Sequence, residues 1–509
     1  MLSRLHSISI VGIEGVVCEV EVDVASRGFE KTMIVGLPDA AVKESVERTK
    51  SAIINSGYTY PKTQSLINLA PGDVKKVGPS FDLPIALGIL IGQGLIDTST
   101  ARNCAFTGEL ALDGRVRPVD GVLCMAMTAA AAGFKRIIVP QDNALEAAVV
   151  RNIEVYGVGS LAQVAGFLSG QLALETATID LDELFNASSN YEVDFTDVKG
   201  QESVKRALIV AAAGAHNIMM IGPPGAGKTM LAQRLATILP SLCLEESLET
   251  TRIYSVAGLL RKSRSLLATR PVRMPHHSAS GPALVGGGTI PRPGELSLAH
   301  FGILFLDEFA EFPRHILEMI RQPMEDGFVT VSRARGSTCF PAQFMLVGAM
   351  NPCPCGYFGT YARRCKCTPN QIEQYLSKIS GPLVDRIDIH IDVPAISFSA
   401  LRSKSNQLGS AAMRESVVKA REIQKGRFGD GKTTTNARMN HKQVEKFCKL
   451  DGACELILKQ AMVEFGLSAR AHDKICKVAR TIADLAGSES RAVEHIAEAI
   501  SYRKLDRKL

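Results

Sequence analysis

The sequence predicts an α/β protein of roughly three domains. Residues 1–170 alternate short β-branched runs with Ala-rich helical runs. Residues 193–392 contain an apolar strand that leads through a glycine-rich loop into a helix, and two further buried strands. Residues 393–509 show helical patterns without a strong strand signal. The polar, acidic residues 171–192 between the first two blocks are typical of a linker.

Particular segments carry these patterns. In the first block we expect five strands, at Ser9–Val11, Cys18–Val24, Lys31–Val35, Leu66–Leu69 and Phe134–Pro140. We expect buried helix faces at Ala86–Ile91 and Cys124–Ala132, and C-terminal helices at Met413–Gly426 and Ala471–Ala486.

Composition limits the class of protein. The 509 residues are 46% hydrophobic and 22% charged, with a formal net charge of +6, which permits nucleic-acid binding without establishing it. The N-terminal residues lack the apolar run of a signal peptide, and the longest apolar runs are shorter than the ~18–20 residues that span a bilayer. We therefore expect a cytoplasmic protein that does not enter a membrane, with the 12 cysteines as reduced thiols or metal ligands.

A phosphate-binding loop follows the apolar run Asn217–Ile221 and precedes the helical run Met230–Leu239. Its residues are Gly222, Pro223, Pro224, Gly225, Ala226, Gly227, Lys228 and Thr229. Glycines let backbone N–H groups point at phosphate oxygens, and the helix N-terminus adds its dipole. We expect ATP here, with Lys228 at the β- and γ-phosphates and Thr229 as a ligand of Mg²⁺.

Two further strands end in polar residues. Gly302–Leu306 leads into Asp307, which can hold Mg²⁺ through water, and Glu308, which can polarise the attacking water. Phe344–Ala349 leads to Asn351, which could orient that water; alternatively, Asn351 only forms a turn before Pro352.

The order of these motifs resembles that of an AAA+ ATPase. Val198–Gln201, the phosphate-binding loop, Leu306–Glu308, Asn351 and Leu383–Arg386 follow one another as they do there. Arg273–Ser280, Val285–Ile290 and a four-cysteine segment make the whole chain similar to the YifB/ComM family of Mg-chelatase-like AAA+ proteins. The resemblance implies an AAA+ P-loop NTPase core with a parallel sheet at 193–392 and a C-terminal helical lid at 393–509.

The resemblance also implies two arginine roles and an assembly. Arg386 matches the arginine finger that a neighbouring subunit inserts against the γ-phosphate, and Arg470 matches the sensor arginine of the lid. From the residues alone, Arg386 could instead form a surface ion pair with Asp385 or Asp388. Family members form hexameric rings, so a homo-hexamer is implied.

Two segments bear on the substrate. Phe328–Phe340 alternates as a hairpin with Arg333 and Arg335 at its turn, which could grip DNA phosphates or form only a solvated polar turn. Residues 265–297 resemble a channel-facing insertion of related ring motors. There we expect His276 and His277 to structure the loop rather than to bind metal.

Four cysteines lie close together in the sequence. Cys353 and Cys355 form one C-x-C pair, and Cys365 and Cys367 form another. Four converging thiolates suit tetrahedral Zn²⁺, although C-x-C is tighter than the usual pair spacing. The alternatives are a reduced structural loop and a redox-sensitive cluster.

The N-terminal block resembles the catalytic domain of Lon proteases. Lys76–Asp82 and Thr107–Val119 carry this resemblance and put Ser80 at the position of the nucleophile. Leu123 stands where such a protease needs its general-base lysine, and a serine without a base is a poor nucleophile. We therefore expect residues 1–170 to form a Lon-protease-like α/β domain without peptidase activity, serving as a docking or DNA-binding collar.

These features together predict an ATP-hydrolysing motor. The resemblance implies a hexameric DNA helicase that acts on single-stranded and branched DNA, promoting branch migration in recombination of incoming DNA during natural transformation. The alternative is a Mg-chelatase-type motor subunit or another protein-remodelling AAA+ ATPase. An ATP-dependent protease is disfavoured by Leu123, and a scaffold without turnover is disfavoured by the complete set of nucleotide-site residues.

Overall fold

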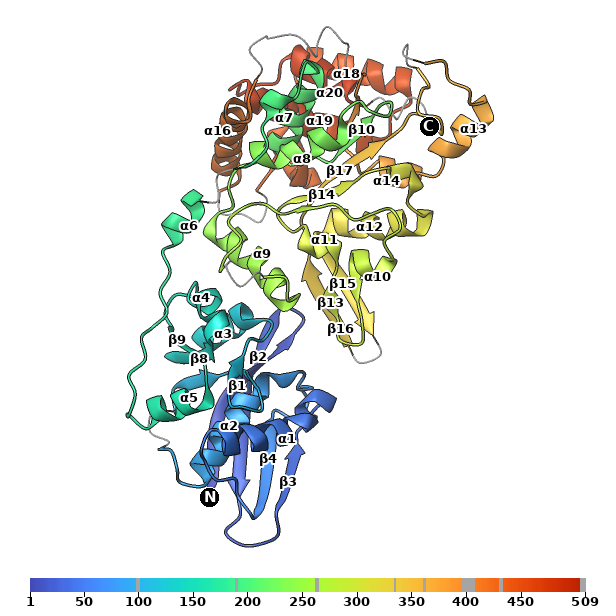
Figure 1. Ribbon diagram of the computed structural model, residues 1–509. Helices are drawn as coiled ribbons and strands as arrows, with labels where there is room; N and C mark the ends of the chain where they lie inside the picture. The colour runs from blue at the N-terminus through green and yellow to red at the C-terminus, as the bar shows by residue number, and fades with distance from the viewer. Residues whose placement is uncertain are drawn as a thin grey trace. The chain divides into compact units, whose positions relative to one another are not determined.

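The chain forms two compact units in the computed structural model (Figure 1). The structure describes residues 1–97, 101–187, 191–260, 265–333, 336–359, 363–395, 408–429 and 434–503. The first unit comprises Met1–Ala187 and Leu244–Ala268, and the second comprises Ser188–Cys243 and Thr269–Leu509. The segment Leu244–Ala268, which lies inside the block 193–392 in sequence, thus belongs to the first unit. Within the described ranges, no helix is both long and apolar enough to cross a membrane.

A mixed seven-stranded sheet organises the first unit. In spatial order its strands are β3 (Lys31–Val35), β4 (Gln64–Ala70), β2 (Glu14–Val24), β1 (Leu2–Val11), β5 (Cys104–Phe106), β8 (Arg136–Pro140) and β9 (Glu154–Val158). β1 pairs antiparallel with β2, and β2 with β4, whereas the outer pairs are parallel. The five strands expected from the sequence are all confirmed.

Helices cover both faces of this sheet because its strands are apolar on both sides. Leu5 of β1 packs in the core that contains α2, and Ile8 of the same strand packs in the core that contains α3. The elements around the sheet are α1 (Ala40–Asn55), α2 (Asp82–Gly92), β6 (Glu109–Leu110), β7 (Val116–Arg117), α3 (Val122–Ala131), α4 (Ala144–Ala147), α5 (Leu161–Leu168), α6 (Leu181–Ala187) and α9 (Leu244–Val256). Of these, α9 packs against α3, which explains why Leu244–Ala268 belongs to this unit.

A five-stranded parallel sheet organises the second unit. Its order is β11 (Val272–Arg273), β14 (Ile303–Leu306), β17 (Met345–Met350), β10 (Ile218–Ile221) and β18 (Ile389–Asp392). Every neighbouring pair is parallel. All residues of β14 and β17 are buried, as expected for inner strands of a parallel sheet. The predicted α/β class with a parallel ATPase sheet is confirmed.

The helices that pack on this sheet come partly from between its strands and partly from the C-terminal residues after β18. One core joins the strands to α7 (Glu202–Gly214), α8 (Lys228–Ile238), α16 (Ser410–Phe428), α17 (His441–Phe447), α18 (Gly452–Phe465), α19 (Ala469–Leu485) and α20 (Val493–Ser501). The smaller elements are α10 (Gly281–Val285), β12 (Gly286–Gly287), β13 (Arg292–Pro293), α11 (Glu295–Leu298), α12 (Arg314–Asp326), β15 (Phe328–Arg333), β16 (Gly336–Pro341), α13 (Pro369–Leu376) and α14 (Gly381–Val384). The expected C-terminal helices and the β15–β16 hairpin are confirmed.

A buried ionic network fixes the starts of β10 and of the edge strand β18 to α19. The carboxylate of Asp388 accepts a hydrogen bond from the Asn217 backbone N–H at 2.9 Å and forms an ion pair with Lys474. His216 Nδ1 lies 3.6 Å from the same carboxylate. Burial alone would raise the pKa of Asp388, but Lys474 and His216 outweigh it and hold that pKa well below its usual range. Asp388 is therefore ionised at neutral pH.

Replacing Asp388 with Asn should lower the free energy of unfolding by about 3 kcal/mol, because Lys474 would keep a poorly compensated charge. A carboxyl with a lowered pKa contributes stability above its unfolded-state pKa and loses it only as the pH falls through the lower folded value, so the full effect is expected at pH 7. Chemical denaturation measures it. Glu415→Gln, which removes an exposed ion pair with Lys419, is the control and should leave the free energy of unfolding almost unchanged, because solvent screens that pair. Equal losses in the two variants would contradict the assignment.

Candidate active site

Three parallel strands bring their polar ends to one edge of the second sheet. β10 ends at Ile221 and leads into Gly222, β14 leads into Asp307, and β17 leads into Asn351. Since β17 pairs with both β10 and β14 in parallel register, the three carboxyl ends are adjacent. Ligands of open parallel sheets bind at this edge.

The phosphate-binding loop has the geometry of an anion site. Gly225 and Gly227 adopt left-handed backbone conformations, with φ of 75° and 84°. α8 begins at Lys228, and its N-cap residue Gly227 makes no side-chain capping bond. The first N–H groups of a helix have no partner within the helix, so those of α8 can bind phosphate oxygens.

Side chains from the three strand ends contact the loop and its helix. Thr229 Oγ1 donates to Asp307 Oδ2 at 2.6 Å, which puts both expected Mg²⁺ ligands side by side. Lys228 Nζ donates to Asn351 Oδ1 at 3.2 Å and to the carbonyl oxygen of Gly222 at 2.7 Å. Burial lowers the pKa of Lys228, and the charge of Asp307 partly offsets this. The structure therefore brings the predicted nucleotide-site residues together within one unit.

Glu308 has a partner that the sequence did not indicate. His277 Nδ1 lies 3.1 Å from Glu308 Oε2, and the His277 ring also contacts Phe312 edge-on at 6.4 Å between centroids. Neighbouring His276 Nδ1 accepts a hydrogen bond from the Ser278 N–H at 3.3 Å and lies 2.8 Å from Ser278 Oγ, which agrees with the loop-structuring role expected for this residue. His277 thus reaches the carboxylate that the sequence assigned to water activation. In the sequence, the one signal that the segment containing His277 is functional was the resemblance of residues 265–297 to a channel-facing insertion.

Gln201 connects the upstream motif to the loop. Its side-chain Nε2 donates to the carbonyl oxygens of Ala226 and Pro394, at 3.0 Å each. The motif Val198–Gln201 therefore supports the phosphate-binding loop through the hydrogen bond from Gln201 to Ala226.

Arg386 and Arg470 line one pocket of about 590 Å³ in the second unit. Arg386 pairs with Glu325 at 2.9 Å rather than with Asp385 or Asp388, and it donates to the carbonyl oxygen of Pro382. Within the described residues its buried Nε has no hydrogen-bond partner.

This pocket lies at the other end of the strands from the phosphate-binding loop. Asn217, which directly precedes β10, lines the pocket, and its side chain donates to the carbonyl oxygen of Arg386 at 3.3 Å. β10 then runs four residues, about 13 Å, before the loop begins at Gly222. Arg386 therefore belongs to the edge of the sheet opposite its own chain's nucleotide site.

The four cysteines of the predicted zinc site converge. Their sulfur atoms all lie within 4.8 Å of one another. The Sγ–Sγ distances are 3.4 Å for Cys353–Cys355, 3.5 Å for Cys355–Cys365 and 3.7 Å for Cys353–Cys365. A tetrahedral ion with Zn–S bonds of about 2.3 Å would separate its sulfurs by about 3.8 Å, so the cluster fits zinc closely. Backbone N–H groups of Lys366 and Tyr357 lower the pKa of Cys355 to about 6, whereas the Cys367 N–H is outweighed by burial and the neighbouring thiols, which raise the pKa of Cys365 to about 12.

Of the two arginines expected to contact DNA, the structure describes only the backbone of Arg333. Arg333 is the last residue of β15, and its backbone pairs with Gly336. Arg335 lies outside the described residues. The two strands of the β15–β16 hairpin pair in register from Phe328 to Pro341.

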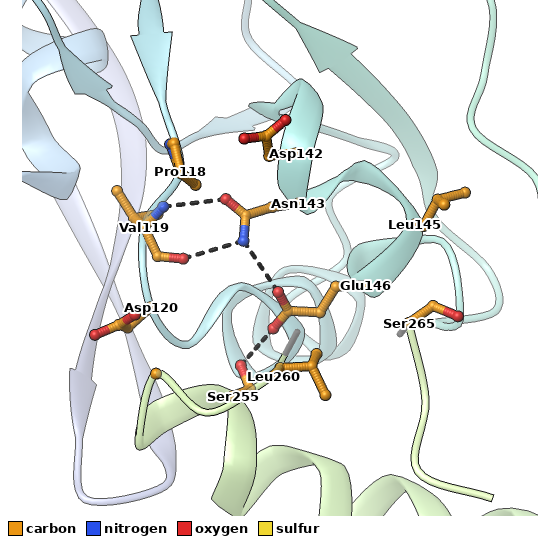
Figure 2. A pocket seen from close by; sticks show the side chains of 11 residues that line it. Pro118, Val119, Asp120, Asp142, Asn143, Leu145, Glu146, Ser255, Leu260 and Ser265 are labelled. Carbon is orange, nitrogen blue, oxygen red and sulfur yellow. Dashed lines mark hydrogen bonds between the residues drawn. The ribbon is translucent and has the colours of Figure 1, made fainter. Parts of the chain in front are cut away.

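An acidic pocket of about 190 Å³ lies in the first unit (Figure 2). It is next to Leu123, which stands where a Lon-like protease would need its lysine base. Glu146 accepts hydrogen bonds there from the Leu123 N–H at 3.0 Å, from Asn143 at 3.0 Å and from Ser255 of α9. Burial raises the pKa of Glu146, and these hydrogen bonds partly offset it. Ser80 does not line this pocket; it is buried before α2, where its carbonyl oxygen accepts from Gly108.

Comparisons with known proteins agree with this architecture. Residues 194–401 match the family model of magnesium chelatase, subunit ChlI; residues 20–143 match that of subunit ChlI of Mg-chelatase; and residues 407–503 match that of the subunit ChlI C-terminal region.

Relatives that match over their full length identify the family more closely than the domain models do. The chain is 44% identical to competence protein ComM of Haemophilus influenzae, over 100% of this chain and 98% of that protein. It is 41% identical to the uncharacterized protein YifB of Escherichia coli, with the same coverage. The magnesium-chelatase 38 kDa subunit of Rhodobacter capsulatus is 29% identical, over 31% of this chain and 50% of that protein. With its nucleotide site and parallel sheet, the chain belongs to the YifB/ComM family of Mg-chelatase-like AAA+ ATPases.

Proposed function

We propose that this protein is a cytoplasmic, ATP-driven DNA motor. In this proposal it is a hexameric helicase that promotes branch migration while incoming DNA recombines in natural transformation. The observation that carries the proposal is the pairing of Thr229 with Asp307 and of Lys228 with Asn351 at one sheet edge. The full-length similarity to a competence protein supports the choice of DNA as substrate.

Each residue of the site has a distinct role in the proposed hydrolysis. Lys228 and the start of α8 bind the phosphates, while Thr229 and Asp307 hold Mg²⁺. Glu308 orients and polarises the attacking water, and Asn351 lies where it can position that water against the γ-phosphate. The bond between Asn351 and Lys228 supports this role over a simple turn before Pro352.

Arg386 and Arg470 act, in this proposal, on the nucleotide of a neighbouring subunit. Both line the pocket at the edge of the sheet where β10 begins, whereas their own phosphate-binding loop follows the end of β10. Among the described residues the Nε of Arg386 has no hydrogen-bond partner, and it therefore leaves a donor for an incoming anion. One chain then contains two half-sites, and hydrolysis requires the oligomer.

DNA contacts come from the β15–β16 hairpin, with Arg333 and Arg335 at its turn. Phosphate contacts of this kind are independent of sequence and weaken with salt. The family models named for magnesium chelatase keep a chelatase-type or protein-remodelling motor as the alternative. An ATPase rate that does not respond to DNA would favour that alternative.

The first unit serves in this proposal as a collar without peptidase chemistry. Leu123 offers no base, and its backbone N–H is bonded to Glu146 beside a pocket that Ser80 does not line. A nucleophilic serine needs an adjacent base to take its proton.

DNA should stimulate the steady-state ATPase rate, and raising salt should reduce the stimulation, because the contacts are to phosphates. Glu308→Gln should lower kcat by about 10²–10³, since it removes the group that polarises water. A coupled ATPase assay with and without single-stranded and branched DNA, at low and moderate salt, measures both effects. A wild-type rate that is indifferent to DNA contradicts the helicase assignment but leaves the ATPase assignment intact.

Arg386→Ala and Lys228→Ala should each abolish turnover alone and restore part of it when mixed. In a mixed oligomer, the intact loop of an Arg386→Ala chain meets the intact Arg386 of a Lys228→Ala chain. Arg386→Ala alone should still bind ATP, because the residue lies at the opposite end of β10. ATPase rates across mixing ratios test this, with Lys228→Ala mixed with Glu308→Gln as the control that shares one defective half-site. Absence of recovery in the first mixture would contradict a finger role in trans.

Purified protein should contain about one zinc ion per chain, bound by the four cysteines. Cys355→Ser should lose it, because one of four converging thiolates is removed. Cys339→Ser, at an exposed cysteine of β16, should retain it. Elemental analysis of the three proteins decides between zinc and the alternatives, a reduced loop or a redox-sensitive cluster.

A further inference from the structure

The four-cysteine loop contacts the phosphate-binding loop directly. The turn that begins at Cys353 closes with a hydrogen bond from the Gly356 N–H to the Cys353 carbonyl oxygen, at 2.9 Å. A Cβ atom added to Gly356 would lie 2.6 Å from Cδ and 2.8 Å from Cγ of Pro224, the third residue of the phosphate-binding loop. Gly356 therefore touches the Pro224 ring so closely that no side chain fits between them.

Two further contacts join the same stretch of chain to the nucleotide site. The Gly222 N–H donates to the carbonyl oxygen of Met350 at 3.2 Å, and Lys228 bonds the side chain of Asn351. Met350, Gly356 and Asn351 thus contact the first, third and seventh residues of the phosphate-binding loop, Gly222, Pro224 and Lys228. Residues 350–356 form one wall of the site.

The sulfur cluster lies on the far side of this wall, together with a cation–π contact of Arg363 with Tyr357. The described residues between β17 and α13 form neither helix nor strand. Of the four cysteines only Cys353 is buried, and the other three are half-buried. An irregular segment with so little burial gains its order from a cross-link, and a metal bound by four thiolates is such a cross-link.

We propose that the four-cysteine metal site is a structural part of the nucleotide site and that its occupancy sets the affinity for ATP. The bound metal fixes the turn Cys353–Gly356, the turn supports Pro224, and Pro224 holds the phosphate-binding loop in its binding geometry. Gly356 is then a positioning residue that acts through Pro224. This inference rests on the proposed ATP and zinc binding and adds the link between them.

Two glycines of the same loop provide a matched pair of variants. Gly356 and Gly359 both have left-handed backbones, with φ of 81° and 72°, so alanine strains both. Only at Gly356 would the new Cβ meet Pro224, because no atom of the described residues lies within 4 Å of a Cβ at Gly359. The comparison therefore isolates the contact from the strain.

Gly356→Ala should raise the Kd and the KM for ATP about tenfold while leaving kcat within about twofold and the zinc content unchanged. Gly359→Ala should match the wild type in all four quantities. Calorimetric titration with Mg²⁺ and ATP, in a Glu308→Gln background and without DNA, measures Kd. If Gly356→Ala bound ATP with wild-type affinity, or if both variants lost affinity equally, the contact with Pro224 would have no role in ATP binding and the proposal would be wrong.

Metal removal tests the other half of the link. The double variant Cys365→Ser/Cys367→Ser should lose zinc and show a similar rise in Kd, while circular dichroism and thermal unfolding report an intact fold. A metal-free variant that binds ATP like the wild type would overturn the proposal, as would a wild type without metal. Failure of the wild type to bind ATP at all would instead contradict the proposed function, and DNA plays no part in either readout.

Discussion

The position of β10 between β17 and β18 is the constraint on which the rest of the second unit depends. Because both neighbours are parallel to it, the C-terminal end of β10 meets the ends of β17 and β14, where Asn351 and Asp307 follow. Its N-terminal end meets the start of β18, where Asp388 is held by Lys474 and by the Asn217 N–H. A single short strand thus separates the phosphate-binding loop from the arginine pocket.

Under the roles proposed here, this separation means that one chain contains all the residues of a nucleotide site but not a complete site. The loop, the proposed magnesium ligands and the carboxylate of Glu308 lie at one edge of the sheet, and Arg386 with Arg470 lies at the other. The strand is too stiff and too well buried to bring the two edges together within one chain. In the proposed ring of identical chains, each copy would present one edge of its sheet to the next and so complete the site.

Local patterns made the nucleotide site predictable from the sequence. An apolar strand that ends in a glycine loop, or in Asp307–Glu308, needs only neighbouring residues to be recognised, and the parallel sheet then brings the strand ends together. The contact of His277 with Glu308 depends on the path of residues 265–297 back to the sheet. Local hydrophobic periodicity in the sequence does not determine that path. The pairing of Arg386 with Glu325 rather than with adjacent aspartates and the approach of Gly356 to Pro224 are also tertiary events.

The same reasoning applies to α9, whose sequence neighbours suggested the wrong unit. Residues 239–243 are all that separate it from α8, yet Ser255 of α9 bonds Glu146, and α9 packs on α3. The chain then returns through Ala268 to β11 and onward to His277. Both covalent connections of this excursion therefore lead to nucleotide-site elements, one to the helix that starts at Lys228 and the other to the segment that contacts Glu308. Chain connectivity thus links Leu244–Ala268 of the first unit to nucleotide-site elements of the second at both of its ends.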